Sequence, residues 1–91
     1  MKTFNDLKFK KHQNYSIGGF KELAEMKFSN SYGVSVITGG YGSDSAPYEV
    51  AILYNGALCY TTNITDDVIG WLTEDGVTDV MNKVQKLTPS L

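Results

Sequence analysis

The sequence contains no arginine, only one cysteine and one histidine, and no long hydrophobic run. All eight basic residues are lysines, whereas arginine is the usual residue for bidentate recognition of phosphate groups and of guanine. Six tyrosines could stack on single-stranded nucleic acid, but such sites combine aromatic residues with a basic groove, and the net charge here is −2. We therefore expect no direct binding to nucleic acid.

Cys59 and His12 are the only members of their residue types. A single cysteine can form neither an intramolecular disulfide nor a cysteine-based metal cage. A nucleophilic site needs a thiol or hydroxyl beside a base and an orienting group, and neither residue lies in a known signature of that kind. We therefore predict no enzymatic activity, no cofactor and no metal. Cys59 is interpreted as a buried strand residue and His12 as a solvated one.

No segment approaches the ~18 apolar residues that a membrane-spanning helix needs, and the first residues lack the apolar run of a secretory signal. We expect no membrane association and a cytoplasmic location. A chain of 91 residues can bury one core but not two, so we predict a single domain over residues 1–91. Residues 1–19 are weakly patterned and are interpreted as an extended N-terminal arm or edge segment.

A first hairpin is predicted from residues 24–38. Residues 24–28 alternate apolar and charged side chains, the two-residue period of a strand with one buried face. Residues 32–38 are β-branched and alternating, and turn-forming residues lie between the two segments. A helix remains the alternative for the first segment, because a helical face is also formed by Phe20, Leu23, Ala24 and Lys27.

A second hairpin is predicted around Asn55-Gly56. This dipeptide tolerates the positive φ angles of a type I′ turn, whose twist suits paired strands. The flanking strands are expected at residues 48–54 and 57–60. Together with the first hairpin they give a four-stranded antiparallel sheet, or a five-stranded one if the N-terminal segment adds an edge strand.

Two segments near the C-terminus, residues 64–69 and 72–77, share one pattern: an apolar residue, Thr, two acids, any residue and an apolar residue. Threonine can cap a helix, acids complement the positive end of its dipole, and the flanking apolar pair can form a hydrophobic staple. We predict two short helices, the first ending near Leu72 and the second before Pro89. An apolar stripe on the second helix should face the sheet, formed by Val77, Val80, Met81, Val84 and Leu87. The predicted fold is α+β, with two C-terminal helices packed on one face of the sheet.

Five acidic residues lie within these predicted helix starts and just after them, with no basic residue among them: Asp66, Asp67, Glu74, Asp75 and Asp79. The spacing of a calcium-binding loop is absent. Stabilisation of helix starts accounts for four of the five acids. A sharper hypothesis is that this acidic face docks on a basic groove of a protein that normally handles nucleic acid.

The glycine-rich segment 39–47 is predicted to be the longest loop. Backbone N–H groups of glycines can cradle an anion, but the third glycine of a dinucleotide fingerprint is missing and the loop leads into a strand. It is interpreted as a connection. The alternative is a contact with a ligand or partner, and the candidate residues for it are Gly40, Tyr41, Gly42 and Asp44.

From about Phe28 to Leu87 the sequence resembles a family of small uncharacterised phage and prophage proteins. The resemblance is carried by residues 32–36 (YGVSV), 48–53 (YEVAIL), 58–62 (LCYTT), 64–74 (ITDDVIGWLTE) and 84–87 (VQKL). Gly76 departs from the pattern, since relatives tend to place an acid there. The order of strands and then helices also resembles some anti-CRISPR inhibitors in plan.

The family carries no assigned activity, but small acidic phage proteins without catalytic residues commonly act by occluding a host machine. The resemblance therefore implies a phage accessory protein that binds a host protein or defence complex, such as an anti-CRISPR or other anti-defence inhibitor. Two alternatives stay open: a binder or sponge for a small ligand such as a signalling nucleotide, and a homo-oligomeric structural or assembly component of the virion.

Overall fold

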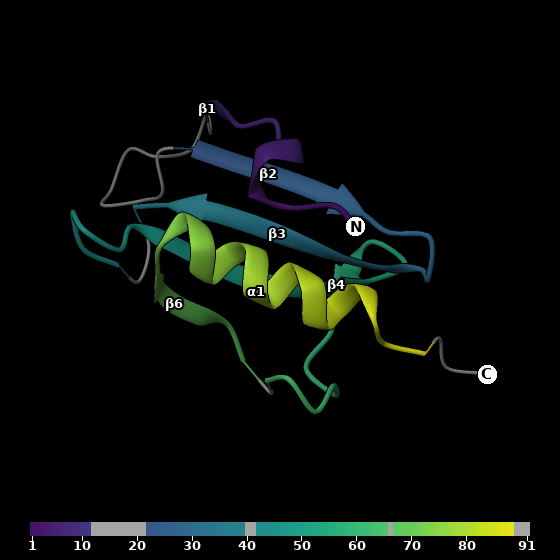
Figure 1. Cartoon of the computed structure of the whole chain (residues 1–91). Helices are drawn as coiled ribbons and strands as arrows, with labels where there is room; N and C mark the ends of the chain where they lie inside the picture. The colour runs from purple at the N-terminus through teal and green to yellow at the C-terminus, as the bar shows by residue number, and fades with distance from the viewer. Residues whose placement is uncertain (12–21, 40–41, 66, 89–91) are drawn as a thin grey trace.

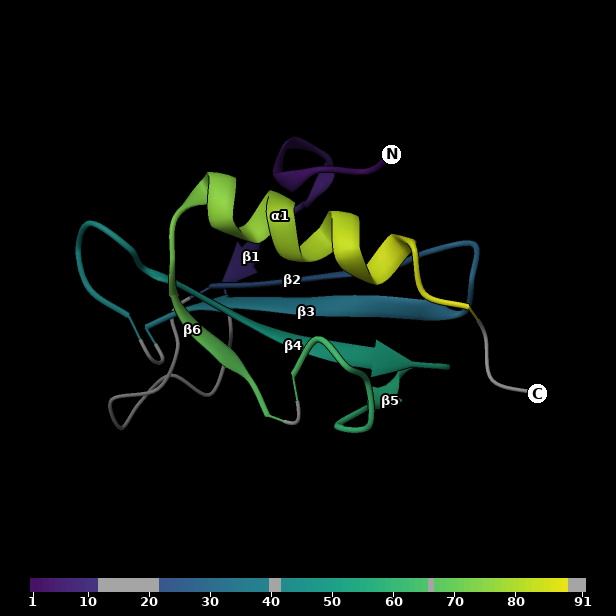
Figure 2. The same ribbon diagram turned by 60° about the horizontal axis from the view of Figure 1, so that its bottom comes forward.

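The computed structural model describes residues 1–11, 22–39, 42–65 and 67–88. Within these ranges the chain forms one antiparallel sheet with a single α-helix across one of its faces (Figures 1 and 2). The strands are β1 (Lys10–Lys11), β2 (Glu22–Lys27), β3 (Tyr32–Thr38), β4 (Tyr48–Tyr54), β5 (Ala57–Leu58) and β6 (Ile69–Leu72); the helices are the short 3-10 helix η1 (Phe4–Asp6) and α1 (Glu74–Gln85). The α+β class is thus confirmed.

The strands β1 to β5 lie side by side in chain order. The far edge of β4 is divided between two short strands: β5 pairs with Leu53 and Tyr54, whereas β6 pairs with Tyr48 and Val50. The sequence predicted four or five strands, whereas the described residues form six. The unpredicted strand is β6, which occupies a part of the β4 edge that β5 leaves open (Figure 2).

Both predicted hairpins are present. In β2, Ala24 is buried while Glu25 and Lys27 are exposed, so the strand interpretation of this segment is confirmed over the helical one. Asn55 and Gly56 have φ angles of 52° and 85°, the left-handed pair that a type I′ turn requires. The strand after the turn is shorter than predicted, although the Cys59 N–H still donates to the Ile52 carbonyl at 2.8 Å.

The first predicted helix, from Thr65 to about Leu72, is wrong. The Thr65 hydroxyl accepts a hydrogen bond from the Asp67 N–H at 3.1 Å and donates to the Asp67 carbonyl, which closes a turn instead of capping a helix. The residues that follow form β6 on the open edge of β4. A helix of about two turns has little stability of its own, whereas the sheet edge offers backbone partners and suits β-branched residues. In the described part of the chain, one C-terminal α-helix and not two therefore covers the face of the sheet.

The second predicted helix is confirmed as α1. Thr73 is its N-cap, because its hydroxyl accepts from the Gly76 N–H at 3.1 Å, and Glu74 and Asp75 lie in the first turn. At the other end, the Asn30 side-chain amide donates to the carbonyls of Val84 and Leu87, both at 2.9 Å. The β2–β3 turn thus satisfies carbonyl groups that a helix end leaves without partners.

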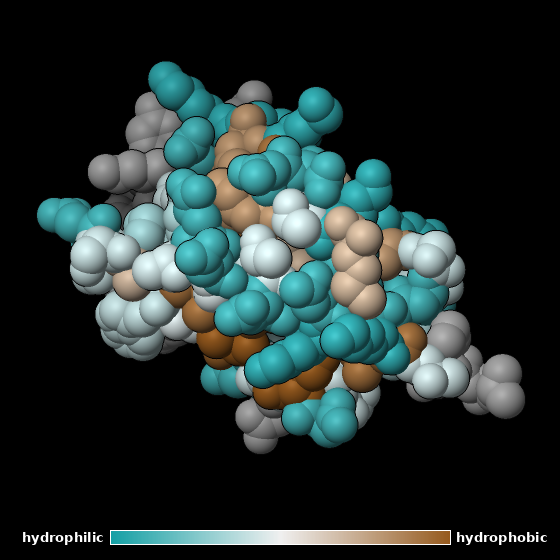
Figure 3. Space-filling view, viewed as in Figure 1, coloured by the Kyte–Doolittle hydropathy of each residue, from teal (hydrophilic) through white to brown (hydrophobic). Residues whose placement is uncertain are grey.

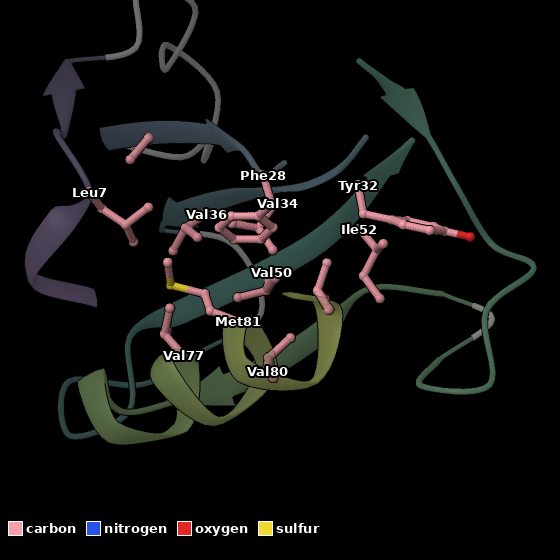
Figure 4. Packing of buried hydrophobic residues seen from close by; sticks show 12 residues of the cluster. Leu7, Phe28, Tyr32, Val34, Val36, Val50, Ile52, Val77, Val80 and Met81 are labelled. Atoms are coloured by element: carbon pink, nitrogen blue, oxygen red, sulfur yellow. The ribbon is translucent and has the colours of Figure 1, made fainter. Parts of the chain in front are cut away.

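The core lies between α1 and the sheet (Figure 4). Its largest fully buried side chains come from the strands β3 and β4 and from α1: Val34, Val36, Val50, Ile52, Val77, Met81 and Val84. Leu7 joins the same cluster from the N-terminal segment. The predicted helical stripe is confirmed, with Leu87 half-buried at its end.

The N-terminal segment is held against α1. The Phe4 N–H donates to the Thr78 hydroxyl at 3.0 Å, and the Gln85 side-chain amide exchanges two hydrogen bonds of 2.8 Å with the Lys2 backbone. Lys10 and Lys11 then pair with the start of β2, so this part of the segment is an edge strand as predicted. Residues 12–19 of the predicted arm lie outside the described residues. No helix within the described ranges is long and apolar enough to cross a membrane.

Candidate functional site

An open hollow of about 430 Å³ lies between the first turn of α1 and the segment that leads into β4. Both ribbon views show residues 42–47 beside the start of α1 (Figures 1 and 2). The hollow is lined by Asp44, Ser45, Pro47, Tyr48, Thr73, Glu74 and Asp75. Three of these residues are acidic and none is basic, so we call this region the acidic hollow.

Both walls of the acidic hollow are held by local hydrogen bonds. On one side the Thr73 cap fixes the start of α1 and with it Glu74 and Asp75. On the other side, the Ser43 and Ala46 backbones exchange hydrogen bonds of 3.0 and 3.2 Å, which closes a turn around Asp44. Residue 42 must be glycine for this closure, because a Cβ there would lie 2.8 Å from the Ala46 carbonyl oxygen.

Tyr48 lines the hollow and is influenced by Glu74, one of the carboxylates of the hollow. Its pKa is raised above the ordinary value, first by burial, then by the negative charges of Glu74 and Glu22. The Tyr48 ring packs edge-on against Phe4, with ring centroids 5.0 Å apart, and so it is anchored from the α1 side of the sheet. The smaller contributions of Glu74 and Glu22 to this rise reflect the negative charge at this end of the sheet.

The acidic hollow brings together residues that the sequence assigned to two separate motifs. Asp44 comes from the glycine-rich loop, and Glu74 and Asp75 come from the helix start. Asp79 is exposed one turn further along α1 and extends the acidic surface. Asp67 does not belong to it, because it lies before β6, at the end of that strand remote from Thr73.

The remaining predicted site residues, Gly40, Tyr41 and Asp66, lie outside the described residues. Among the described residues, no group of three or more histidine, cysteine or acidic side chains is placed to hold a metal ion. The carboxylates of the acidic hollow can instead accept hydrogen bonds from lysine or arginine side chains of another molecule.

Trp71 is a surface residue that the sequence interpretation missed. The predicted first helix ended near Leu72 and so included Trp71, but this residue lies in β6 with 62% of its surface exposed and a φ of 52°. It precedes the Thr73 cap by two residues. The β-branched and aromatic character of residues 68–72 was a signal for a strand, and exposed tryptophan is enriched among the residues that dominate protein–protein binding.

The face of α1 turned away from the sheet is largely hydrophilic, with hydrophobic colour in a strip between α1 and β6 (Figure 3). Comparisons of the chain with protein-family models, curated proteins and solved structures found no match.

Proposed function

We propose that this chain is a protein-binding domain that docks its acidic hollow onto a basic groove of another protein. The observation that carries this proposal is the convergence of Asp44 with Glu74 and Asp75 around one open hollow, from segments thirty residues apart in the sequence. Complementary charge of this kind raises association rates and fixes the orientation of the two partners.

The carboxylates suit this role because the backbone that carries them is ordered before binding. The Thr73 cap and the Ser43–Ala46 turn fix the backbone that carries them. Groups that are already ordered lose less conformational entropy on association, so more of the interaction energy appears as affinity. Carboxylates also match arginine side chains in bidentate geometry.

A groove that normally binds nucleic acid fits best as the docking site, since it presents basic side chains spaced for a polyanion. We place the chain, on its resemblance to phage and prophage proteins, in the cytoplasm of a host cell, where it would occupy such a groove on a host protein or defence complex. An inhibitor of an antiviral defence system, of which anti-CRISPR proteins are one kind, would act in this way.

The first experiment is affinity capture of the tagged chain from host lysate, followed by binding kinetics with the captured partner. The variant Asp44→Asn/Glu74→Gln/Asp75→Asn removes the three charges with little change in side-chain volume. We expect its affinity to fall by about tenfold or more at low salt, mostly through a slower association rate. A matched pair of single variants serves as the control. Asp75→Asn removes one charge from the hollow, and Asp67→Asn removes the same charge outside it.

The proposal requires Asp75→Asn to slow association and Asp67→Asn to leave it nearly unchanged. Equal effects of the two variants would mean that only net charge matters and would refute a docking site at the hollow. A thermal shift with one member of a nucleotide panel would instead favour a small-ligand binder. Large oligomers in light scattering, together with the protein in purified particles, would favour a virion component.

A further inference from the structure

Among the described residues, no strand pairs with the outer edge of the second half of β2. β1 pairs with this strand only at Glu22 and Leu23, and in the described part of the chain no other strand pairs with the same edge. Figure 1 shows β1 beside the start of β2, and on the side of β2 away from β3 it shows no strand beside the arrowhead end. An unpaired strand edge is a template for pairing with another chain.

The backbone groups that face this open edge belong to Glu25 and Lys27. The Phe28 N–H donates to the Tyr32 carbonyl at 2.7 Å on the β3 side. Because hydrogen-bonding direction alternates along an antiparallel strand, Phe28, Met26 and Ala24 direct their N–H and C=O groups toward β3. The N–H and C=O groups of Glu25 and Lys27 therefore point outward.

The side chains of the same two residues carry opposite charges. Glu25 and Lys27 are exposed, whereas Ala24 is buried on the α1 side of the sheet. Because side chains alternate between the two faces along a strand, Glu25 and Lys27 lie on the face opposite α1. Glu25 and Lys27 lie on either side of Met26. If a second copy of the strand runs antiparallel to the first and is centred on the same residue, its lysine lies opposite the glutamate of the first copy.

We infer that two copies of this chain pair through β2 in an antiparallel arrangement with a two-fold axis at Met26. In this register Glu25 faces Lys27 of the partner subunit, and the two residues exchange both of their outward backbone hydrogen bonds. The same residues form an opposite-charge pair across the strands, once on each side of the axis. Met26 faces its own copy in the closely spaced, non-hydrogen-bonded pair.

Charge selects this register over its neighbours. An axis at Glu25 would set glutamate against glutamate, and an axis at Lys27 would set lysine against lysine, and like charges directly across a sheet are destabilising. A lysine on an edge strand usually opposes pairing with other chains. In the register centred on Met26, Lys27 instead faces Glu25 of the partner subunit. The lysine therefore stabilises this register and disfavours the others.

Open space adjoins the edge on both faces of the sheet. A hollow of about 520 Å³ lies between the N-terminal segment and the end of β2, where Lys27, Phe28 and Ser29 border it. A second hollow of about 270 Å³ lies on the opposite face, where Gly33 has no side chain. A Cβ at Gly33 would clash with the Met26 carbonyl oxygen, so this position must be glycine and no side chain at residue 33 fills the second hollow.

The test is the molar mass of the full chain by light scattering or sedimentation equilibrium, at concentrations from about 10 μM to about 1 mM. The wild-type chain should form a concentration-dependent dimer that weakens as salt is added. Glu25→Lys or Lys27→Glu alone sets like charges across the axis and should raise the dissociation constant by about tenfold or more. The double variant Glu25→Lys/Lys27→Glu restores opposite charges and should return it to within about threefold of the wild-type value.

A wild-type chain that stays monomeric throughout this range would overturn the inference, as would a double variant that dimerises no better than the single ones. Both residues are exposed, so circular dichroism should show unchanged folding in every variant. The dimer uses none of the residues of the acidic hollow. Loss of dimerisation in Lys27→Glu is therefore distinguishable from loss of partner binding in the Asp75→Asn variant.

Discussion

At the scale of single residues, Tyr48 reports on the acidic hollow. Burial and the neighbouring Glu74 and Glu22 carboxylates disfavour the negatively charged tyrosinate, so the pKa of Tyr48 is raised above its usual value of 10.0. A group whose pKa is higher in the folded chain contributes stability below the unfolded pKa and loses it as the pH rises through the folded pKa. Alkaline pH should therefore destabilise the fold through this residue.

The prediction is a difference between the wild-type chain and Tyr48→Phe. Above pH 10 the free energy of unfolding of the wild-type chain should decline more steeply than that of the variant, which keeps the ring but has no proton to lose. Urea unfolding at several pH values measures this difference. Parallel decline of the two proteins would contradict the prediction.

Glu74→Gln gives a second, direct readout of the same interaction. Removal of this charge should bring the Tyr48 pKa closer to its usual value, and ring-carbon NMR shifts can follow the titration of that one tyrosine. Asp67→Asn serves as the control, since Asp67 does not line the hollow. A Tyr48 pKa that moves equally in both variants would mean that the Glu74 carboxylate is not a specific neighbour.

At the scale of elements, two threonines in the same sequence pattern have different roles. Thr73 caps α1 through the Gly76 N–H, whereas Thr65 closes a turn with Asp67. Thr73→Ala should lower the free energy of unfolding by about 1 kcal/mol, the usual cost of losing an N-cap. Thr65→Ala removes hydrogen bonds of an exposed turn and should cost only about 0.5 kcal/mol.

Urea unfolding, monitored by circular dichroism at helix-sensitive wavelengths, measures the free energy of unfolding of both variants. The comparison is internally matched, because the amino-acid change and its sequence surroundings are nearly the same. A larger loss in Thr65→Ala than in Thr73→Ala would indicate that the segment before β6 has helical structure in solution.

These two threonines also show how far the sequence determines the fold. The hairpins were predictable because their signals are local: alternation in β2 and β3, and the φ angles of Asn55-Gly56. The choice between helix and strand for residues 65–72 is not local. It depends on the edge of β4 that β5 leaves unpaired, which no pattern within residues 64–77 reveals.

The candidate site follows the same division. The sequence identified Asp44, Glu74 and Asp75 as candidates, but in two unrelated motifs. Only the packing of α1 beside the start of β4 brings them around one hollow. Asp67 lies apart from them, although the sequence pattern had grouped it with Glu74 and Asp75 at helix starts.

At the scale of the whole molecule, the N-terminal segment is joined to the core through Leu7. This side chain is only 9% exposed and belongs to one cluster with residues of β2, β3, β4 and α1. The hydrogen bonds from Lys2 and Phe4 to α1 hold the same segment in place. An independent arm would contribute little to the stability of the rest, whereas a part of a single domain unfolds together with it.

Leu7→Ala distinguishes these cases, and Leu58→Ala is its matched control because Leu58 is 57% exposed. Truncation of a buried leucine costs about 2–5 kcal/mol through lost burial and the cavity it leaves, so Leu7→Ala should lower the urea midpoint strongly. Leu58→Ala should change the free energy of unfolding by about 0.5 kcal/mol at most. Unfolding by circular dichroism and by tyrosine absorbance should remain one coincident transition, since the core joins all these elements. Equal small effects of both substitutions would mean that residues 1–11 dock without stabilising the domain, and the prediction of a single domain from the first residue would then be wrong.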